Sequence, residues 1–500
     1  MIQELQPKEV FSIFHEITQV PRPSKREGKI IEWLKAFAVK HNLEHTVDEA
    51  GNIIMRKPAT PGYEDKPGVI LQAHMDMVCE KNNDTEHDFD NDPIHTYIDG
   101  DFIKAQGTTL GADNGIGMAL MLAAITSDTL KHPALECLFT VDEETGLTGA
   151  FRLQDGCLNG KQLINLDSED DGQVFSGCAG GIDTLAKMHY EAKEHPMMQA
   201  SSGTPLRLSG DEAKRLAIHI KVGGLMGGHS GDDINKGRGN ANKILVRFLY
   251  QVMQATDMQL ATIDGGNLRN AIAREAEAVI AIPMAYKEDI RVMLNHYIAT
   301  IESEIGDVEK DFFMHLETTD MPALFVPADK AKVLIQALYA CPHGMIAMSK
   351  TMPGLVETSN NLASIKMRED ENGAYIEINT SQRSSIESKK HDIKQMVECA
   401  LALACDEVTH GDGYPGWAPN PQSPLLEVTK KAYQDLFAAE PKVLAIHAGL
   451  ECGLFLEKYP YLDMVSIGPQ MFGVHSPQER LSITSTGKCW EWLNAILEAL

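Results

Sequence analysis

The sequence lacks the features that mark membrane, secreted and disordered proteins. No apolar run reaches the roughly 18 residues that a membrane-spanning helix needs. The first residues, MIQELQPKEVFSIFHEI, do not show a basic stretch followed by an apolar one, so no secretory signal is expected. The nine cysteines are scattered without a Cys-x-x-Cys pair, which argues against a disulfide framework. We therefore expect a folded, cytoplasmic protein without a membrane partner.

Positive charge is also scarce. The chain has 45 Lys and Arg against 71 Asp and Glu, which gives a formal net charge of −26. Such an acidic surface repels phosphate backbones and anionic lipids, so nucleic acid and membrane partners are disfavoured. Many acidic proteins are simply soluble, although spare carboxylates can also bind metal ions. The net charge therefore argues against nucleic acid and membrane partners, but it does not assign a function.

Aromatic residues make up only 6% of the chain, but the hydrophobic share of 43% is ample for a core. The chain has 500 residues, whereas single cores stop growing at roughly 250–300 residues, so two domains are expected. The pattern of predicted helices and strands changes near residues 185 and 396. We predict an α/β fold in which residues 1–185 and 396–500 form a catalytic domain with a mainly parallel sheet flanked by helices. Residues 186–395 form an inserted α+β lid domain.

Three predicted buried strands end in the same way, with an apolar run followed by polar and acidic residues. They lie in PGVILQAHMDMV, ALECLFTVDEETG and KQLINLDSED. In open parallel sheets, ligands bind at the carboxyl ends of the strands. We therefore expect the chemistry of this protein to concentrate at these three strand ends.

Two of the candidates are ambiguous when taken alone. His74 and Asp76 are two residues apart on one strand, so they face the same side, and Asp76 could orient a metal-binding His74. In a chain with 18 histidines, a single His-x-Asp pair is more often structural. Asp113 follows the Gly-rich turn TTLGADNGIG, where it could approach a ligand or simply cap the next helix.

The acidic residues after the second strand make a stronger case. Asp142, Glu143 and Glu144 are adjacent and repel one another, which a surface loop tolerates through solvent. At the end of a buried strand, a cation explains them better. One carboxylate could then bind metal while its neighbour accepts a proton from metal-bound water. Asp167, at the end of the third strand, and His475, in FGVHSPQE, are each more often structural when taken alone.

Together these positions form a metal-ligand set of two imidazoles and three carboxylates: His74, Asp113, Glu144, Asp167 and His475. Such a set suits zinc, with manganese or cobalt as alternatives. If Asp113 bridges, each of two ions takes one His, one carboxylate and the shared Asp. Two ions roughly 3.5–4 Å apart can hold a hydroxide and polarise a carbonyl. We therefore predict two metal ions per chain.

The ordered series AHMD, GADNGIGMA, VDEETG, NLDSED and VHSPQE resembles the di-zinc metallopeptidases of the aminoacylase and glutamate-carboxypeptidase group. Within that group, PRPSKREG, GNIIMRKPATPG, QAHMDMVCEKN, GGHSGDDINKGRGNAN and HAGLECG resemble a branch of bacterial dipeptidases, from about residue 8 to the end. The resemblance implies that His74 and Asp167 bind one zinc, that Glu144 and His475 bind the other, and that Asp113 bridges them.

The resemblance also implies catalytic roles. Asp76 would orient His74, and Glu143 would be the general base that takes a proton from the bridging water and delivers it to the leaving amine. The peptide bond after Asp113 is often cis in this group. His447 is a rival to His475 as the late ligand, but the family pattern His-x-x-x-Glu favours His475.

In the predicted lid, the resemblance implies that His229 in GGHSG stabilises the oxyanion and that Asn270 in NLRNAIAREA binds substrate. Arg383 in TSQRSS would hold the substrate carboxylate, for which guanidinium geometry is suited. Outside the family these would be a turn His, a turn Asn and a surface Arg. Ala273 stands where the family usually has Pro. Gly449 in IHAGLECG could offer backbone contacts, whereas the nearby Glu451 has no assigned role.

The resemblance implies hydrolysis of unblocked dipeptides, including Xaa-His types such as carnosine, by a zinc-bridged hydroxide. Tripeptide cleavage and N-acyl amino acid deacylation use the same ligands and remain alternatives, as does a non-catalytic binding protein on this fold. The expected partner is a small peptide substrate, and a homodimer through the lid domain is a further expectation. The sequence leaves open the preferred dipeptide, the physiological metal and whether His229 serves its own site or a partner's.

Overall fold

The computed structural model describes residues 2–194, 214–371, 373–447 and 449–500. The chain forms two compact units. Unit 1 comprises Met1–Cys178, Trp417–Ile446 and Leu450–Leu500, and unit 2 comprises Ala179–Gly416 and His447–Gly449. Among the described residues, no helix combines the length and apolar character needed to cross a bilayer.

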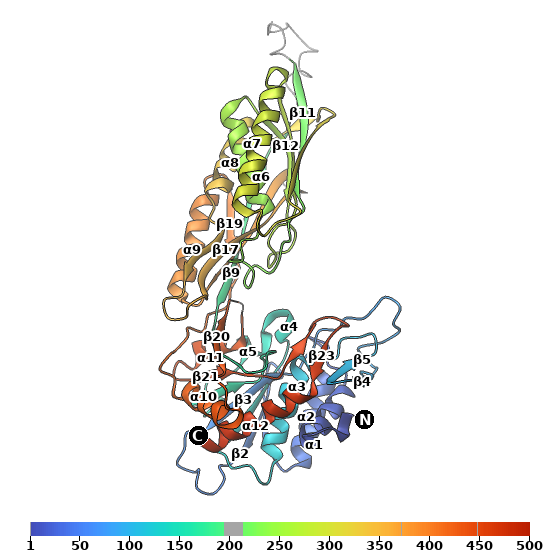
Figure 1. The fold of residues 1–500 in the computed structure, drawn as a ribbon, viewed down its shortest axis with the longest axis vertical. Coiled ribbons are helices and arrows are strands. Elements are labelled where there is room, and N and C mark those ends of the chain that lie inside the picture. The colour runs from blue at the N-terminus through green and yellow to red at the C-terminus, as the bar shows by residue number, and fades with distance from the viewer. Residues whose placement is uncertain (1, 195–213, 372, 448) are drawn as a thin grey trace. The chain divides into compact units, whose positions relative to one another are not determined.

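Unit 1 is built on an eight-stranded sheet whose strands come from both the N-terminal and the C-terminal parts of the chain (Figure 1). Its strands run in the order β1 (Glu44–Val47), β2 (Ile53–Lys57), β6 (Leu135–Thr140), β3 (Val69–His74), β7 (Gln162–Asn165), β21 (Asp463–Ser466), β8 (Gln173–Cys178) and β20 (Lys442–Ile446). The central pairs β6–β3, β3–β7 and β7–β21 are parallel, whereas β1 and β2 pair in antiparallel fashion. The pairs β2–β6 and β21–β8 are antiparallel as well, whereas β20–β8 is parallel. The predicted α/β fold is thus confirmed, with a mixed sheet that is parallel at its centre.

Helices cover both faces of this sheet because the central strands are apolar on both sides. One core contains Val69 and Leu71 of β3, together with side chains from α1 (Lys8–Thr18), α2 (Gly28–Lys40), α3 (Ala112–Thr126), α10 (Pro424–Phe437) and α12 (Ile483–Ala499). The opposite core contains Ile70 and side chains from α5 (Thr148–Arg152) and α11 (Glu451–Lys458). The remaining helices of unit 1 are short, namely η1 (Ile2–Glu4) and α4 (Glu143–Gly146).

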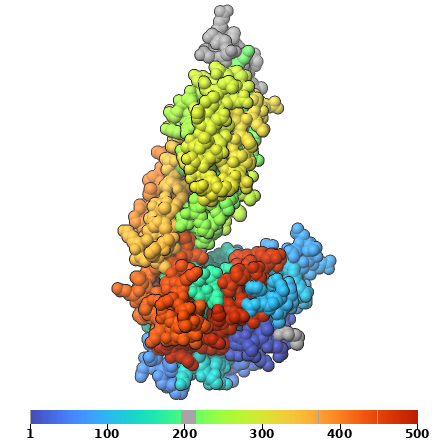
Figure 2. Space-filling model, viewed as in Figure 1, coloured from blue at the N-terminus to red at the C-terminus, as the bar shows by residue number. Residues whose placement is uncertain are grey.

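A small antiparallel sheet joins distant parts of the chain within unit 1. Its order is β22 (Met471–Phe472), β23 (Arg480–Ser482), β5 (Phe102–Ala105) and β4 (Thr96–Asp99). Figure 2 shows the consequence at the surface, where C-terminal residues in red lie against residues near position 100 in light blue. The β22–β23 connection contains His475, so this sheet attaches the late candidate ligand to the first part of the chain.

Unit 2 is an antiparallel sheet with a helical layer on one face (Figure 1). The strand order is β14 (Phe313–Thr319), β11 (Arg215–Gly223), β13 (Ala276–Pro283), β12 (Gln259–Gly265), β17 (Val356–Asp370), β18 (Gly373–Ser384), β9 (Gly180–Tyr190) and β19 (Glu407–His410), with β16 (Gly344–Met348) paired to β17. The helices are α6 (Ala241–Ala255), α7 (Lys287–Ile305), α8 (Ala328–Ala340), α9 (Glu387–Leu401) and η4 (Met284–Tyr286). A separate pair is formed by β10 (Lys193–Glu194) and β15 (Leu324–Phe325).

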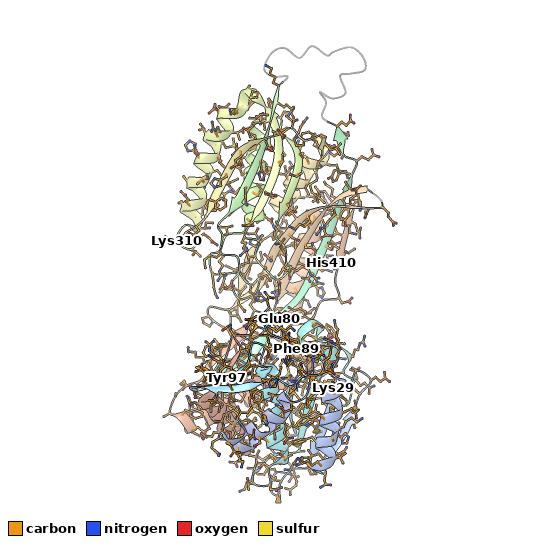
Figure 3. The ribbon with its side chains drawn as sticks, turned by 90° about the vertical axis from the view of Figure 1, so that its right-hand side faces the viewer. Lys29, Glu80, Phe89, Tyr97, Lys310 and His410 are labelled. Atoms are coloured by element: carbon orange, nitrogen blue, oxygen red, sulfur yellow. The ribbon has the colours of Figure 1, made fainter. Side chains whose placement is uncertain are left out.

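The bounds of unit 2 differ from the predicted 186–395. The unit begins at Ala179 because β9 is a strand of its sheet. It continues to Gly416 because β19, which follows α9 in the chain, pairs with β9. Figure 3 shows His410, the last residue of β19, in this unit. The segment His447–Gly449 also clusters with unit 2, although its neighbours in sequence belong to unit 1. The lid is therefore longer than the sequence texture suggested.

Candidate metal centre

The strands deliver polar side chains to one face of the sheet in unit 1. On β3, Ile70 packs in the α11-side core, and Gln72 and His74 follow it at intervals of two. On β7, Leu163 packs in the same core, and Asn165 follows at the same interval, leading to Asp167 just beyond the strand. Because side chains alternate between the two faces of a strand, the buried apolar residues determine on which face of the sheet the polar residues at the strand end lie.

Asp113 lies at the centre of the predicted ligand set. Its Oδ1 is 2.9 Å from His74 Nε2, and its Oδ2 is 3.1 Å from His475 Nε2. His74 Nε2 is also 3.4 Å from Asp167 Oδ1, and His475 Nε2 is 3.0 Å from Glu144 Oε2. The structure therefore brings together all five predicted ligands, which we call the Asp113 cluster. They form two halves that share Asp113.

The local backbone around Asp113 is unusual. Gly111 precedes α3 in the left-handed region with φ of 68°, and the Asp113–Asn114 peptide bond is cis. Asp113 has non-helical dihedral angles at the start of α3, and Asn114 Oδ1 accepts from Gly117 N–H at 3.1 Å, so Asn114 and not Asp113 caps the regular part of this helix. Asn114 donates from Nδ2 to Asp167 Oδ1 at 2.6 Å, which ties the two carboxylate-bearing segments together.

Asp76 contacts several groups in addition to the His74 ring. Its Oδ1 is 3.2 Å from His74 Nδ1, and Ser24 Oγ donates to its Oδ2 at 2.8 Å. The backbone N–H groups of Glu143 and Glu144 also donate to its two oxygens, at 3.1 and 3.3 Å. Asp76 therefore lies beside the imidazole of His74 and binds the turn that presents Glu143 and Glu144.

The cluster has the donor chemistry of a divalent metal site. Two imidazole nitrogens and three carboxylates converge, and Glu144 Oε1 is buried without a hydrogen-bond partner among the described residues. Burial, with Asp113 and Glu144 nearby, raises the pKa of Asp167 to about 6 in spite of His74. Burial also raises the pKa of Glu143, and the carboxylates of Asp167 and Glu144 add to this. Carboxylates crowded in this way require positive charge to ionise together, and this is what a bound cation would supply.

The sequence of the chain matches a known family of peptidases. The sequence pattern of peptidase family M20/M25/M40 matches residues 70–499. The chain belongs to this family. Membership confirms the predicted metallopeptidase and the use of divalent metal, whereas the identity and number of the ions remain predictions.

Full-length relatives agree with this assignment to the M20/M25/M40 peptidases. The cytosol non-specific dipeptidase of Escherichia coli (strain K12) is 40% identical over 499 residues, covering 100% of this chain and 99% of that protein. The crystal structure of aminoacylhistidine dipeptidase from Vibrio alginolyticus is also 40% identical, with a TM-score of 0.91 and coverage of 100% and 98%. The aminopeptidase PepT structure from Bacillus cereus ATCC 10987, at 17% identity, a TM-score of 0.61 and 99% coverage of both chains, shares the fold alone.

The predicted substrate-binding residues of this M20/M25/M40 peptidase lie in unit 2. His229 and Ala271 form a β-bridge, and Ser230 N–H donates to the Asn270 carbonyl at 2.8 Å, so His229 and Asn270 are held on adjacent segments. Arg383 is 7% exposed and donates from Nη1 to Tyr414 Oη at 2.8 Å, whereas its Nε has no hydrogen-bond partner among the described residues. Its charge helps to lower the pKa of Asp232.

Gly449 and His447 belong to the same part of unit 2. A Cβ on Gly449 would come within 2.6 Å of the Tyr414 ring, so the ring that contacts Arg383 also packs on this glycine. His447 is buried, with Nε2 2.7 Å from Ser359 Oγ, and burial lowers its pKa to about 3. Thus His475, and not its rival His447, contacts Asp113.

Several residues that support the cluster were not predicted from the sequence. Arg22, Ser24 and Glu479 contact the segments that carry His74, Asp76 and Asp113. Arg22 and Ser24 lie in PRPSKREG, which was recognised without a role, and Glu479 stands four residues after His475. An arginine in a Pro-containing stretch before a helix carries no chemical signal by itself, because its partners here are backbone carbonyls.

Proposed function

We propose that the protein is a metal-dependent dipeptidase that hydrolyses unblocked dipeptides, including Xaa-His types such as carnosine. The observation that carries this proposal is the convergence of His74 and His475 on the two oxygens of Asp113. The names of the two relatives at 40% identity, a non-specific dipeptidase and an aminoacylhistidine dipeptidase, supply the substrate class.

In this proposal the Asp113 cluster holds two zinc ions, with manganese or cobalt as alternatives. His74 and Asp167 would hold one, His475 and Glu144 the other, and Asp113 would be shared. When bound, the metal would polarise the scissile carbonyl and make water more acidic. The protein residues then orient the peptide, move protons and exclude water.

Glu143 is the proposed general base. It follows β6, next to the ligand Glu144, and its backbone N–H is held by Asp76. Burial and neighbouring carboxylates raise its pKa, which makes it a better proton acceptor than an ordinary glutamate. It would take a proton from the attacking water and deliver it to the nitrogen of the leaving amine. Asp76, through His74 Nδ1, would keep the imidazole in one orientation.

His229 and Arg383 are proposed to bind the substrate. Asp232 N–H donates to His229 Nδ1 at 3.2 Å, so a neutral ring carries its proton on Nε2. Nε2–H can then donate to the oxyanion that forms from the scissile carbonyl. Arg383 is buried with its Nε unpaired among the described residues, and it would hold the free carboxylate of the dipeptide. Asn270 and Gly449 would add contacts to the substrate.

The test compares the wild type with Glu143→Gln, which keeps the size of the side chain but removes the base. We expect kcat to fall by roughly 10²–10⁴-fold while two ions remain bound per chain. Glu491→Gln, an exposed change on α12, is the matched control and should hydrolyse dipeptides normally. Full activity of Glu143→Gln would remove Glu143 as the base.

The substrate class is tested on the wild type. Carnosine, other unblocked dipeptides, tripeptides and N-acyl amino acids are compared before and after chelation, and then with zinc, manganese or cobalt restored. A preference for tripeptides or acyl amino acids would replace the dipeptidase proposal. Absence of chelator-sensitive hydrolysis of any of these would instead indicate a binding protein.

We also propose a cytoplasmic location, in line with the name of the Escherichia coli relative. The proposed partner is the small peptide substrate alone, without nucleic acid or membrane. A homodimer through unit 2 remains a proposal, which light scattering coupled to gel filtration would test.

A further inference from the structure

The turn Leu110–Asp113 sets the position of the shared ligand. Gly111 adopts a φ of 68°, and a Cβ there would come within 2.6 Å of Arg22 Nη2 and 2.7 Å of Met77 Sδ, so no other residue fits without a shift. The turn leads directly into α3, whose first N–H groups cannot be paired within the helix. These groups need an acceptor from elsewhere in the chain.

Glu479 supplies that acceptor for the whole turn. Its Oε2 accepts from Leu110 N–H at 2.7 Å and Gly111 N–H at 3.0 Å, and its Oε1 accepts from Ala112 N–H at 2.7 Å and Asp113 N–H at 3.3 Å. The side chain is only 3% exposed. A buried carboxylate that takes four backbone donors at a helix N-terminus is strongly held, both by charge-assisted hydrogen bonds and by the helix dipole.

Arg22 binds the same turn through its carbonyl groups. Its Nη2 donates to the Gly111 carbonyl, and its Nη1 donates to the carbonyls of Met75 and Asp76 at 3.0 and 2.6 Å. This 2% exposed guanidinium therefore links the segment that follows His74 to the turn that precedes Asp113.

The position of Glu479 in the chain gives it a second effect. It lies four residues after His475 and directly before β23, which pairs with β5. His475 is half exposed, has a φ of 61°, and lies in the loop between β22 and β23. The bonds from Glu479 to the start of α3 therefore attach the loop that carries His475 to the turn that carries Asp113.

We propose that Glu479 and Arg22 are positioning residues for the metal centre and act on different halves of it. Glu479 fixes His475 relative to Asp113, and Arg22 fixes the His74 segment relative to Asp113. This inference rests on the proposed two-metal function. It follows that loss of Glu479 weakens the ion held by His475 and Glu144 more than the ion held by His74 and Asp167.

Glu479→Gln is a sharp test because it changes little except the acceptors. A glutamine has one oxygen, which can accept two of the four N–H groups, and its amide would face the other two as a donor. Substitution of residues that orient metal ligands typically costs roughly 10–100-fold in metal affinity. We expect this loss for one ion, with a clearly smaller loss for the other.

The experiment measures the two zinc affinities of the full-length protein by competition with a chromophoric chelator, without reference to catalysis. The variants are Glu479→Gln, Arg22→Lys and the exposed control Glu491→Gln, each checked for folding by circular dichroism. Arg22→Lys keeps the charge but cannot reach three carbonyls, and it should weaken mainly the other ion. Cobalt spectra of half-loaded protein, compared with His475→Ala, identify which half each variant loses.

The inference would be overturned if Glu479→Gln bound both ions with wild-type affinity, or if its affinity for both ions fell by the same factor. Should Glu479→Gln fail to fold, Glu479→Asp replaces it, since it keeps both oxygens but shortens their reach, and the same outcomes apply. A wild type that binds no zinc would instead refute the proposed function itself. The two failures are therefore distinguishable.

Discussion

Glu451 is a buried acid that the proposed mechanism does not use, and its substitution gives a quantitative prediction. Gln72 Nε2 and Thr140 Oγ1 donate to its Oε2 at 2.6 and 2.9 Å, and Asn165 Nδ2 donates to Gln72 Oε1 at 2.6 Å. Its other oxygen, Oε1, has no hydrogen-bond partner among the described residues. Burial raises the pKa of Glu451 from 4.5 to about 8.

The sign of the effect follows from proton linkage. Between pH 4.5 and 8 the unfolded chain releases this proton while the folded protein keeps it, so stability falls as the pH rises through this window. The full shift is equivalent to about 5 kcal/mol at pH above 8. Glu451→Gln keeps the acceptor for Gln72 and Thr140 and removes the titration.

The assay is denaturant unfolding of chelator-treated wild type and Glu451→Gln at pH 5.5 and 8.5. All four tryptophans lie in unit 1, so their fluorescence reports the unit that contains Glu451. We expect the variant to be more stable than the wild type by only about 1 kcal/mol at pH 5.5 and by roughly 2–5 kcal/mol at pH 8.5. Glu457→Gln, on the exposed side of α11, should track the wild type at both pH values. Parallel pH dependence of wild type and Glu451→Gln would refute the reasoning.

Three further predictions concern the lid and the packing of α3. Arg383→Ala should raise KM for dipeptides by roughly 10–100-fold because a charge-assisted hydrogen bond to the substrate carboxylate is lost. KM for C-terminally amidated dipeptides should change little. An equal rise in KM for both kinds of substrate would give Arg383 another role. Tyr414→Phe removes the acceptor for Arg383 Nη1 and should raise KM several-fold with kcat nearly constant. Gly117→Ala places a Cβ 2.6 Å from the Leu166 carbonyl oxygen and should destabilise unit 1 by roughly 1–3 kcal/mol, measured by tryptophan-detected unfolding.

The sequence predicts those parts of the site that depend on the periodicity of a strand. His74 and Asp167 could be recognised because each follows an apolar run, and the register of β3 and β7 places those runs side by side. Asp113 and His475 were ambiguous when taken alone, because neither the turn before α3 nor the β22–β23 loop has a periodic pattern, and the family resemblance supplied their roles. Unit 2 extends beyond the predicted lid bounds of 186–395, because β9 begins before residue 186 and β19 follows residue 395, yet both belong to its sheet.

The supporting residues could not be predicted for a different reason. Glu479 and Arg22 act on backbone groups 369 and 89 residues away, at Leu110 and Gly111. Every residue except proline carries a backbone N–H, so the partners of a buried carboxylate leave no mark in the sequence. Gly111 hinted at an unusual turn, and the family pattern His-x-x-x-Glu contains Glu479, but neither indicates that Glu479 binds this turn.

The crowding of carboxylates at the site follows in part from the way the strands pair. Parallel strands end at a common edge, so any acids at their ends are brought together by the same pairing that builds the core. Folding thus concentrates Asp113, Glu144 and Asp167 around two imidazoles, which is unfavourable without a cation. Bound metal would reverse that repulsion, and binding would then stabilise the folded state by mass action. The rigid supports on either side of Asp113 keep the carboxylates from relaxing apart before the ions bind.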